Sequence, residues 1–131
     1  MSKGYVLKEY KNLEEVLLDK DLAGLGDAYV NLLYSLVVSQ KSGHPKSAKV
    51  NNRILAEAVR KAGLRKLLPR RIDRHALGNA AEALIVFAWL DDTVTFEDSL
   101  GILGEKDNGV EAFTALLREI LERLDKRDEQ G

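Results

Sequence analysis

The feature that most constrains the fold is a strongly apolar run between Leu22 and Gln40. Its apolar residues recur at spacings of three and four, which predicts one buried stripe of an α-helix. We expect that stripe to consist of Leu22, Leu25, Tyr29, Leu32, Leu33, Leu36 and Val37. The run therefore predicts a central helix that faces a core.

One acid, Asp27, lies in this run among small residues, which are Ala23, Gly24, Gly26 and Ala28. A glycine costs a helix up to about 1 kcal/mol. Two glycines beside an acid therefore indicate that another backbone, an ion or a ligand comes close. The simpler alternative is a carboxylate that stabilises the helix N-terminus, with glycines that allow tight packing.

A second apolar run, Leu77 to Leu90, repeats this pattern around Glu82, whose small neighbours are Gly78, Ala80, Ala81 and Ala83. A lone buried carboxylate costs several kcal/mol unless it is neutralised, hydrogen-bonded or bound to a cation. Facing carboxylates on two packed helices are therefore a candidate metal site. Magnesium suits such a site best, because it often uses one or two carboxylates and keeps several waters.

The charges of the chain are segregated, although the formal net charge is only -1. Residues 41 to 75 contain eleven Lys or Arg and two acids, which leaves nine bases and nineteen acids elsewhere. This block indicates a polyanion partner; the alternative is an ordinary solvated surface. The block has no Phe, Tyr or Trp, which disfavours single-strand binding by base stacking. It suits double-stranded RNA, which is recognised by shape and through its phosphates.

Helical patterns and breakers predict an all-α single domain over residues 1–131, because no strand of alternating polarity is present. We expect residues 1–12 to form a loose arm, 13–18 a short helix, and Asp21 to cap the central helix. We expect a helix at 47–62 that ends at Gly63 and carries Lys46, Lys49, Arg53 and Arg60 on its outer face.

The second half of the chain continues in the same way. A short turn at 64–68 ends at Pro69, Arg70 and Arg71 lie in a loop, and Asp73 caps the helix that holds Glu82. Further helices are expected at 94–103 and 110–124, followed by a frayed tail at 125–131. We interpret the acids Asp91, Asp92, Glu97 and Asp98 as helix caps, and Trp89 with Phe87 as core or interface residues.

The sequence excludes several classes of protein. It has no cysteine, so disulfides and thiolate metal sites are absent. Polar residues interrupt both apolar runs before either reaches transmembrane length, and the N-terminus lacks the apolar centre of a signal peptide. We therefore expect a soluble cytoplasmic protein with no membrane partner.

Three segments together resemble the ribonuclease III endonuclease domain. They are LAGLGDAYVNLL at 22–33, VNNRILAEAVRKAGLRKLL at 50–68 and GNAAEALIVFAWLDD at 78–92. The first is similar to the family's Leu-Gly-Asp-Ala signature helix, and the third to its second signature, in which a glutamate precedes an alanine. The chain resembles most the compact mini-ribonuclease III type, which consists of a single domain.

The resemblance implies a homodimer that cleaves double-stranded or structured RNA for RNA processing, with Mg²⁺ or with Mn²⁺ in its place. Asp27 and Glu82 match the metal-binding acids. Asn79 stands where the second signature has an aspartate, and it can still offer a neutral oxygen to a cation. Ala23 and Lys20 stand where the first signature has glutamates, so the set of carboxylates is reduced.

We expect the basic residues to contact RNA phosphates: Lys41, His44, Lys46, Lys49, Arg53, Arg70, Arg71 and Arg74. We interpret His75 as a surface or capping residue. The expected function is an endoribonuclease. One alternative is a ribonuclease III-like module that binds RNA without cutting it, and another is a helical scaffold whose basic face meets an acidic protein.

Overall fold

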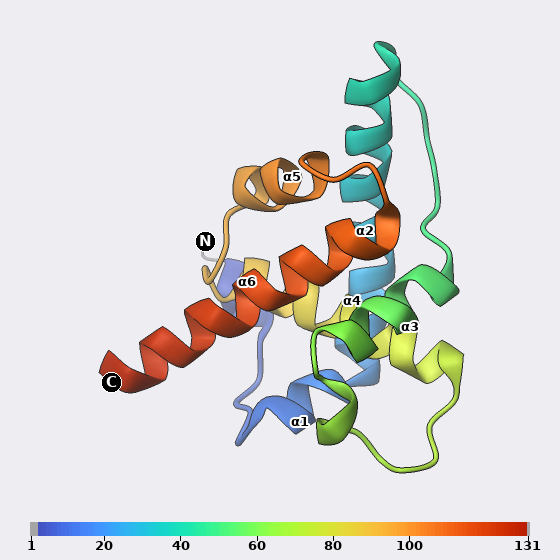
Figure 1. The fold of residues 1–131 in the computed structure, drawn as a ribbon. Helices are drawn as coiled ribbons and strands as arrows, with labels where there is room; N and C mark the ends of the chain where they lie inside the picture. The colour runs from blue at the N-terminus through green and yellow to red at the C-terminus, as the bar shows by residue number, and fades with distance from the viewer. Residues whose placement is uncertain (1–2, 131) are drawn as a thin grey trace.

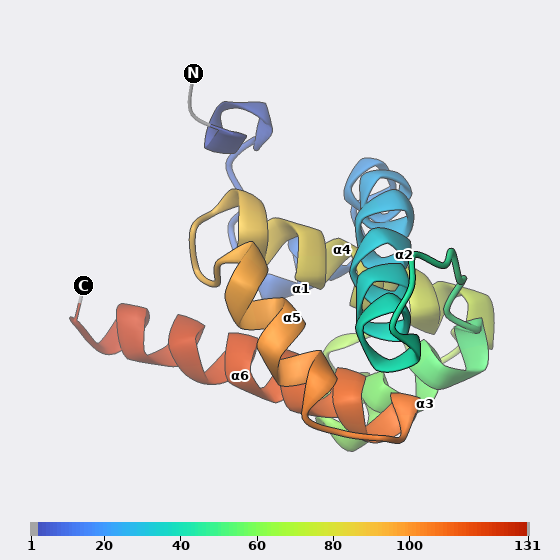
Figure 2. The ribbon, with the colours of Figure 1, turned by 90° about the horizontal axis from the view of Figure 1, so that it is seen from above.

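The computed structural model describes residues 3–130, and within this range the chain is helical and contains no strand. Figure 1 shows the arrangement, and Figure 2 shows it from above. The elements in order are η1 (Lys3–Val6), α1 (Leu13–Leu17), α2 (Lys20–Ser42), α3 (Asn52–Lys61), η2 (Arg65–Leu67), α4 (Arg74–Leu90), α5 (Phe96–Gly104) and α6 (Gly109–Gln130). The prediction of an all-α domain is confirmed.

The central helix, α2, begins one residue after Asp19. The Asp19 carboxylate accepts hydrogen bonds from the backbone N–H groups of Asp21 and Leu22, so it is the N-cap. The prediction that Asp21 caps this helix is wrong, because the cap lies two residues earlier. The helix ends at Gly43, whose φ of 80° is the left-handed conformation that glycine adopts without strain.

A close backbone approach joins α2 to α4. A Cβ atom on Gly26 would lie 2.2 Å from the carbonyl oxygen of Glu82, so only glycine fits there. The expected close approach of another backbone is confirmed at Gly26. Gly24 has open space around it, with nothing within 4 Å of its Cβ position. Backbone contact therefore holds the segments that carry Asp27 and Glu82 side by side.

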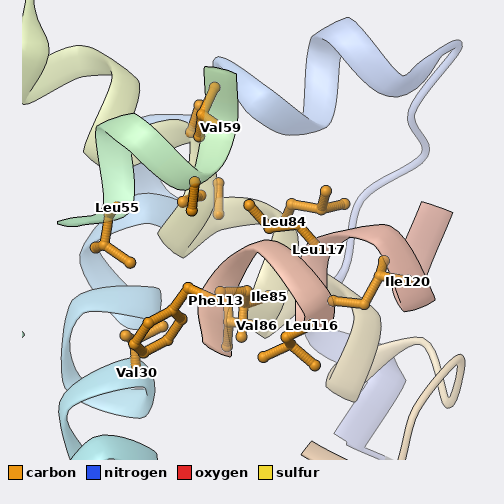
Figure 3. Close-up of a cluster of buried hydrophobic side chains, with 14 of the residues drawn as sticks. Val30, Leu55, Val59, Leu84, Ile85, Val86, Phe113, Leu116, Leu117 and Ile120 are labelled. Carbon is orange, nitrogen blue, oxygen red and sulfur yellow. The ribbon is translucent and has the colours of Figure 1, made fainter. Parts of the chain in front are cut away.

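Helices α3 and α6 complete the core around α2 and α4. Figure 3 shows Phe113, Leu116 and Leu117 of α6 packed near Leu84 of α4 and Val30 of α2. These side chains are fully buried. The core therefore lies behind the carboxylates and fixes the two helices that present them.

The buried face of α2 matches only part of the predicted apolar stripe: Leu22, Tyr29, Leu33 and Val37 are buried as predicted. Leu25 and Leu32 are 47% and 51% exposed, and Leu36 is half-buried. The buried face also includes Ala23, Gly26 and Val30, which the prediction left out. Small residues let α4 approach this side, so the close contact turns the larger leucines outward.

The segment before α3 also differs from its prediction. Residues 46–50 are extended and not helical, and α3 begins only at Asn52 with Asn51 as its N-cap. Lys46 and Lys49 therefore do not share a helix face with Arg53 and Arg60. Side chains of α2 bind the backbone of the extended segment, which explains why it does not continue the helix.

Both ends of the described chain are more ordered than expected. Lys3 forms an ion pair with Asp92, and its Nζ lies 5.6 Å from the centre of the Trp89 ring. Tyr10 meets Phe87 edge to face, so residues 3–12 are held against α4. At the other end α6 continues to Gln130. Residues 1–2 and 131 lie outside the described residues.

Helix α2 alone, among the described residues, is long and apolar enough to cross a membrane by length and composition. A buried core helix passes the same criterion. The residues of α2 that pack on α4 and α5 fit this second explanation. We expected the polar residues in this run to keep it below membrane-spanning length. That expectation is wrong, because α2 meets the criterion in spite of them.

Candidate functional site

A pocket of about 500 Å³ lies beside the N-terminal halves of α2 and α4. Asp27, Glu82 and Asn79, the three residues expected to do chemistry, all line it. The pocket also contains side chains that were not assigned to the site from the sequence, namely Asp19, Lys20, Asn52 and His75. The structure therefore gathers both candidate acids at one open cavity.

Helix α2 presents Asp27 at the pocket, one turn after Ala23. Asp27 is exposed, and the Nδ2 atom of Asn31 donates a hydrogen bond of 3.3 Å to its Oδ1. Ala23 is buried in the pocket wall. The Asn31 amide therefore helps to orient the carboxylate, and a small residue lies beside it.

Helix α4 presents His75, Asn79 and Glu82 at spacings of four and three, which place them on one helix face. Glu82 is only 4% exposed. Burial, together with the hydrogen bond and the negative charge of Asp27, raises its pKa to about 8. In the protein alone, Glu82 therefore holds a proton at neutral pH.

Asp19 lines the same pocket but is already committed to other partners. Its carboxylate accepts a hydrogen bond of 2.7 Å from the Tyr10 hydroxyl in addition to the two from the helix backbone. Burial opposes its ionisation, yet the bonds from Tyr10, Leu22 and Asp21 hold the pKa of Asp19 below its usual value. We assign Asp19 to capping and not to cation binding.

Asn52 and His75 form a contact that no spacing in the sequence indicates. Asn52 Nδ2 lies 3.0 Å from His75 Nδ1. The contact depends on Gly78, where a Cβ would lie 2.8 Å from Asn52 Oδ1. His75 is exposed, as expected, but it stands at the pocket. Only the packing of α3 on α4 brings this pair to the site.

The donor set determines which cation the pocket can hold. Among residues 3–130, no group of three or more His, Cys, Asp or Glu is arranged to bind a metal ion. Two carboxylates and the amide oxygen of Asn79 remain. Magnesium fits this set because it accepts one or two carboxylates and keeps several waters. The residues present therefore fit a hydrated magnesium ion with few protein ligands.

Two of the predicted RNA contacts are chain neighbours of residues that line the pocket. Arg53 follows Asn52, Arg74 precedes His75, and both arginines are exposed. Arg70 and Arg71 are exposed in the loop before α4. That loop is held by the Arg65 guanidinium, which donates to the carbonyl oxygens of Pro69 and Arg70.

Lys41 and His44 lie at the opposite end of α2. Fourteen residues separate Lys41 from Asp27, or about 21 Å along the helix axis. The Lys41 ammonium donates a 2.6 Å hydrogen bond to the Lys106 carbonyl and lies 3.7 Å from Asp107. His44 Nδ1 lies 3.2 Å from the Ser42 carbonyl oxygen. The structure does not bring these two residues to the pocket.

The fold and the pocket together define a class: a helical domain that carries one acid on each of two packed helices at a cavity flanked by arginines. A family model described as Ribonuclease III matches residues 20–126 of the 131-residue chain. The chain therefore belongs to the ribonuclease III family. Comparison with individual curated proteins gave no match.

Proposed function

We propose that this protein is an endoribonuclease that hydrolyses phosphodiester bonds of double-stranded or structured RNA with Mg²⁺, or with Mn²⁺ in its place. One observation carries the proposal: Asp27 and Glu82 come from different helices and line one open pocket, where burial of Glu82 and its contact with Asp27 raise the pKa of Glu82 to about 8. Family membership supports an RNA substrate.

The roles of the residues follow from their placement. A bound divalent cation supplies a positive centre for charge on the phosphate and activates water near neutral pH. Asp27 and Glu82 hold the cation, and Asn79 adds a neutral oxygen from the same face of α4. Lys20 lines the pocket, so its ammonium is available for a phosphate. To hold the cation, Glu82 has to lose the proton that it carries at neutral pH in the protein alone.

The basic surface supplies affinity for the nucleic acid. Arg53 and Arg74 beside the pocket, with Arg70 and Arg71 in the adjoining loop, are free of acidic partners among the described residues. Phosphate contacts of this kind release counterions, so affinity falls steeply with salt. RNA bound through these residues crosses the pocket mouth and brings a phosphate to the carboxylates.

We further propose that the protein acts as a cytoplasmic homodimer, as its family resemblance implies. Leu25 and Leu32, seven residues apart on α2, are each about half exposed, and Leu18, just before α2, is exposed to the same extent. Exposed apolar side chains in a row are typical of an interface. The occupant we propose is a second copy of the same face of α2. Leu32→Glu should then shift the mass measured by light scattering from dimer to monomer.

The direct experiment is cleavage of a long RNA duplex by the purified protein. We expect shortened products with Mg²⁺ and none with EDTA or with Asp27→Asn. Asp107→Asn is a matched control, since this exposed acid lies at the far end of α2 near Lys41. Absence of cleavage by the wild type, or full activity of Asp27→Asn, contradicts the proposal.

A second candidate is an RNA-binding module without catalysis. The observations in its favour are Ala23 and Lys20 in the pocket wall and Asn79 in place of an aspartate. This candidate predicts that the protein retains duplex RNA at low salt, releases it at high salt and does so equally with and without Mg²⁺. Gel-shift titrations in EDTA and in Mg²⁺, read beside the cleavage assay, separate the two functions.

A further inference from the structure

The segment that joins α2 to α3 runs back along the side of α2 to the start of α3, as Figure 1 shows. We call residues Lys46–Val50 of this segment the strap. The strap is extended, and the side chains of Lys46 and Lys49 are exposed. Two residues after the strap, Asn52 lines the pocket. The strap therefore carries positive charge along α2 and ends at the candidate site.

A row of polar side chains on α2 binds the strap. The Ser39 hydroxyl accepts a hydrogen bond from Lys46 N–H at 2.8 Å and donates one to the Lys46 carbonyl at 3.0 Å. The Ser35 hydroxyl makes the same two bonds to Ala48, both at 2.9 Å. These bonds satisfy backbone groups that neither a helix nor a sheet satisfies in this segment.

The row continues to Asn31, whose Oδ1 accepts a hydrogen bond of 2.9 Å from the Val50 N–H. Successive members of the row are four residues apart on α2 and bind every second residue of the strap. Four helical residues rise about 6 Å, and two extended residues rise about 6.6 Å. The two spacings match, so the bonds fix the register of the strap along the helix.

Asn31 also faces the catalytic end of the helix. Its Nδ2 donates to Asp27 Oδ1 at 3.3 Å, one helical turn away. The Asn31 amide thus accepts a hydrogen bond from Val50, the last residue of the strap, and donates one to Asp27, a candidate metal ligand. This is the only bridge from the strap to an acid of the pocket that the structure shows among residues 3–130.

We propose that Asn31 is a positioning residue that couples the strap to Asp27, so that RNA phosphates held by Lys46 and Lys49 are in register with the cation pocket. The inference rests on the proposed function. It assigns the strap to the grip on RNA and the Asn31 donor to the orientation of Asp27. These two roles are separable by substitution.

The experiment compares variants that break one connection each. Ser35→Ala with Ser39→Ala releases the strap and leaves the Asn31 to Asp27 bond in place. We expect KM for duplex RNA to rise severalfold with kcat nearly unchanged, and faster amide hydrogen exchange at residues 46 and 48. Ser42→Ala is the matched control, because this hydroxyl bonds back to Val38 in its own helix; it should leave both values unchanged.

Asn31→Asp keeps an acceptor for the Val50 N–H and removes the donor to Asp27. We expect kcat to fall roughly tenfold, the size typical of lost support for a metal ligand, while exchange at residues 46–50 stays slow. Asn31→Ala should lower kcat and also speed exchange at residue 50. Circular dichroism melting of each variant checks that the fold is retained.

The outcomes separate this inference from the proposed function. Suppose that the wild type cleaves RNA. If Asn31→Asp then has the same kcat as the wild type, or the Ser35 and Ser39 double variant has the same KM, this inference is overturned while the proposed function stands. If the wild type does not cleave, the proposed function fails. Mn²⁺ titration and RNA gel shifts then test the coupling without an activity assay. A Mn²⁺ affinity lowered by Asn31→Ala and an RNA affinity lowered by the double variant support the coupling; unchanged values overturn it.

Discussion

Two groups of acids in this protein have opposite surroundings. Where α4 ends and α6 passes α5, Arg123 bonds to Asp98 at 2.9 Å and to Glu119 at 2.8 Å, and Arg127 pairs with Asp91. At the pocket, neither Asp27 nor Glu82 forms an ion pair within residues 3–130. We call these groups the arginine cluster and the pocket pair.

The pKa values express this difference. In the arginine cluster, the hydrogen bond and charge of Arg123 hold the pKa of Asp98 below its usual value. In the pocket pair, burial and the Asp27 carboxyl raise the pKa of Glu82 to about 8. The first group has its counterions built into the chain, whereas the second requires a proton or an external cation. The comparison therefore separates acids that serve stability from acids available for function.

The largest expected effect is on activity. Glu82→Gln should lower the initial rate of RNA cleavage at least about 100-fold, because cation catalysis contributes several kcal/mol to the barrier. Glu119→Gln makes the same chemical change in the arginine cluster and should leave the rate within about twofold. Equal rates for the two variants would remove the functional distinction between the clusters.

The next effect is on packing beneath the pocket pair. Gly26→Ala places a Cβ 2.2 Å from the Glu82 carbonyl oxygen, so the helices must separate, at a cost of about 3 kcal/mol. Gly24→Ala meets open space and should gain up to about 1 kcal/mol of helix stability. Urea unfolding measures both. A Gly26→Ala protein as stable as the wild type contradicts the described contact.

The two clusters should also respond to pH in opposite directions. Glu82 has a raised pKa in the folded state, so its stabilising contribution is full below about 4.5 and is lost as pH rises toward 8. Asp98 has a lowered pKa, so its contribution is present near neutral pH and is lost as pH falls. Melting temperatures of Glu82→Gln and Asp98→Asn against the wild type, from pH 4 to 9, measure both trends. Trends of the same sign would contradict this comparison.

The smallest effect concerns the arginine cluster itself. Arg123 is 35% exposed, so solvent screens its ion pairs, although its guanidinium also donates to the Thr93 carbonyl. Arg123→Met should cost about 0.5–1 kcal/mol, less at high salt, with unchanged cleavage. If Arg123→Met loses activity but not stability, the arginine cluster has a functional role, which contradicts its assignment to stability alone.

The fold and the acid pair were accessible from the sequence because their determinants are local. Helical spacing defines each helix, and a small-residue patch around one acid occurs in both Asp27 and Glu82 segments. Spacing alone does not set which face of an apolar helix is buried. The buried face of α2 depends on the approach of α4 at Gly26, which turned Leu25 and Leu32 outward.

The remaining parts of the site depend on contacts between distant residues. Asn52 reaches His75 only because α3 packs on Gly78. The helix predicted over residues 47–62 is shortened because Ser35 and Ser39 bind the strap backbone. Residues 3–12 are ordered by contacts with α4, such as Tyr10 on Phe87. No local pattern encodes such contacts, so they were missed.

The most direct test of the account is anomalous diffraction from crystals of the protein soaked in Mn²⁺, with Glu82→Gln crystals as the comparison. The account predicts a peak between the carboxylates of Asp27 and Glu82 that disappears in Glu82→Gln. A pocket without a peak, or a peak only at Asp91, Asp98 or Glu119, would contradict it.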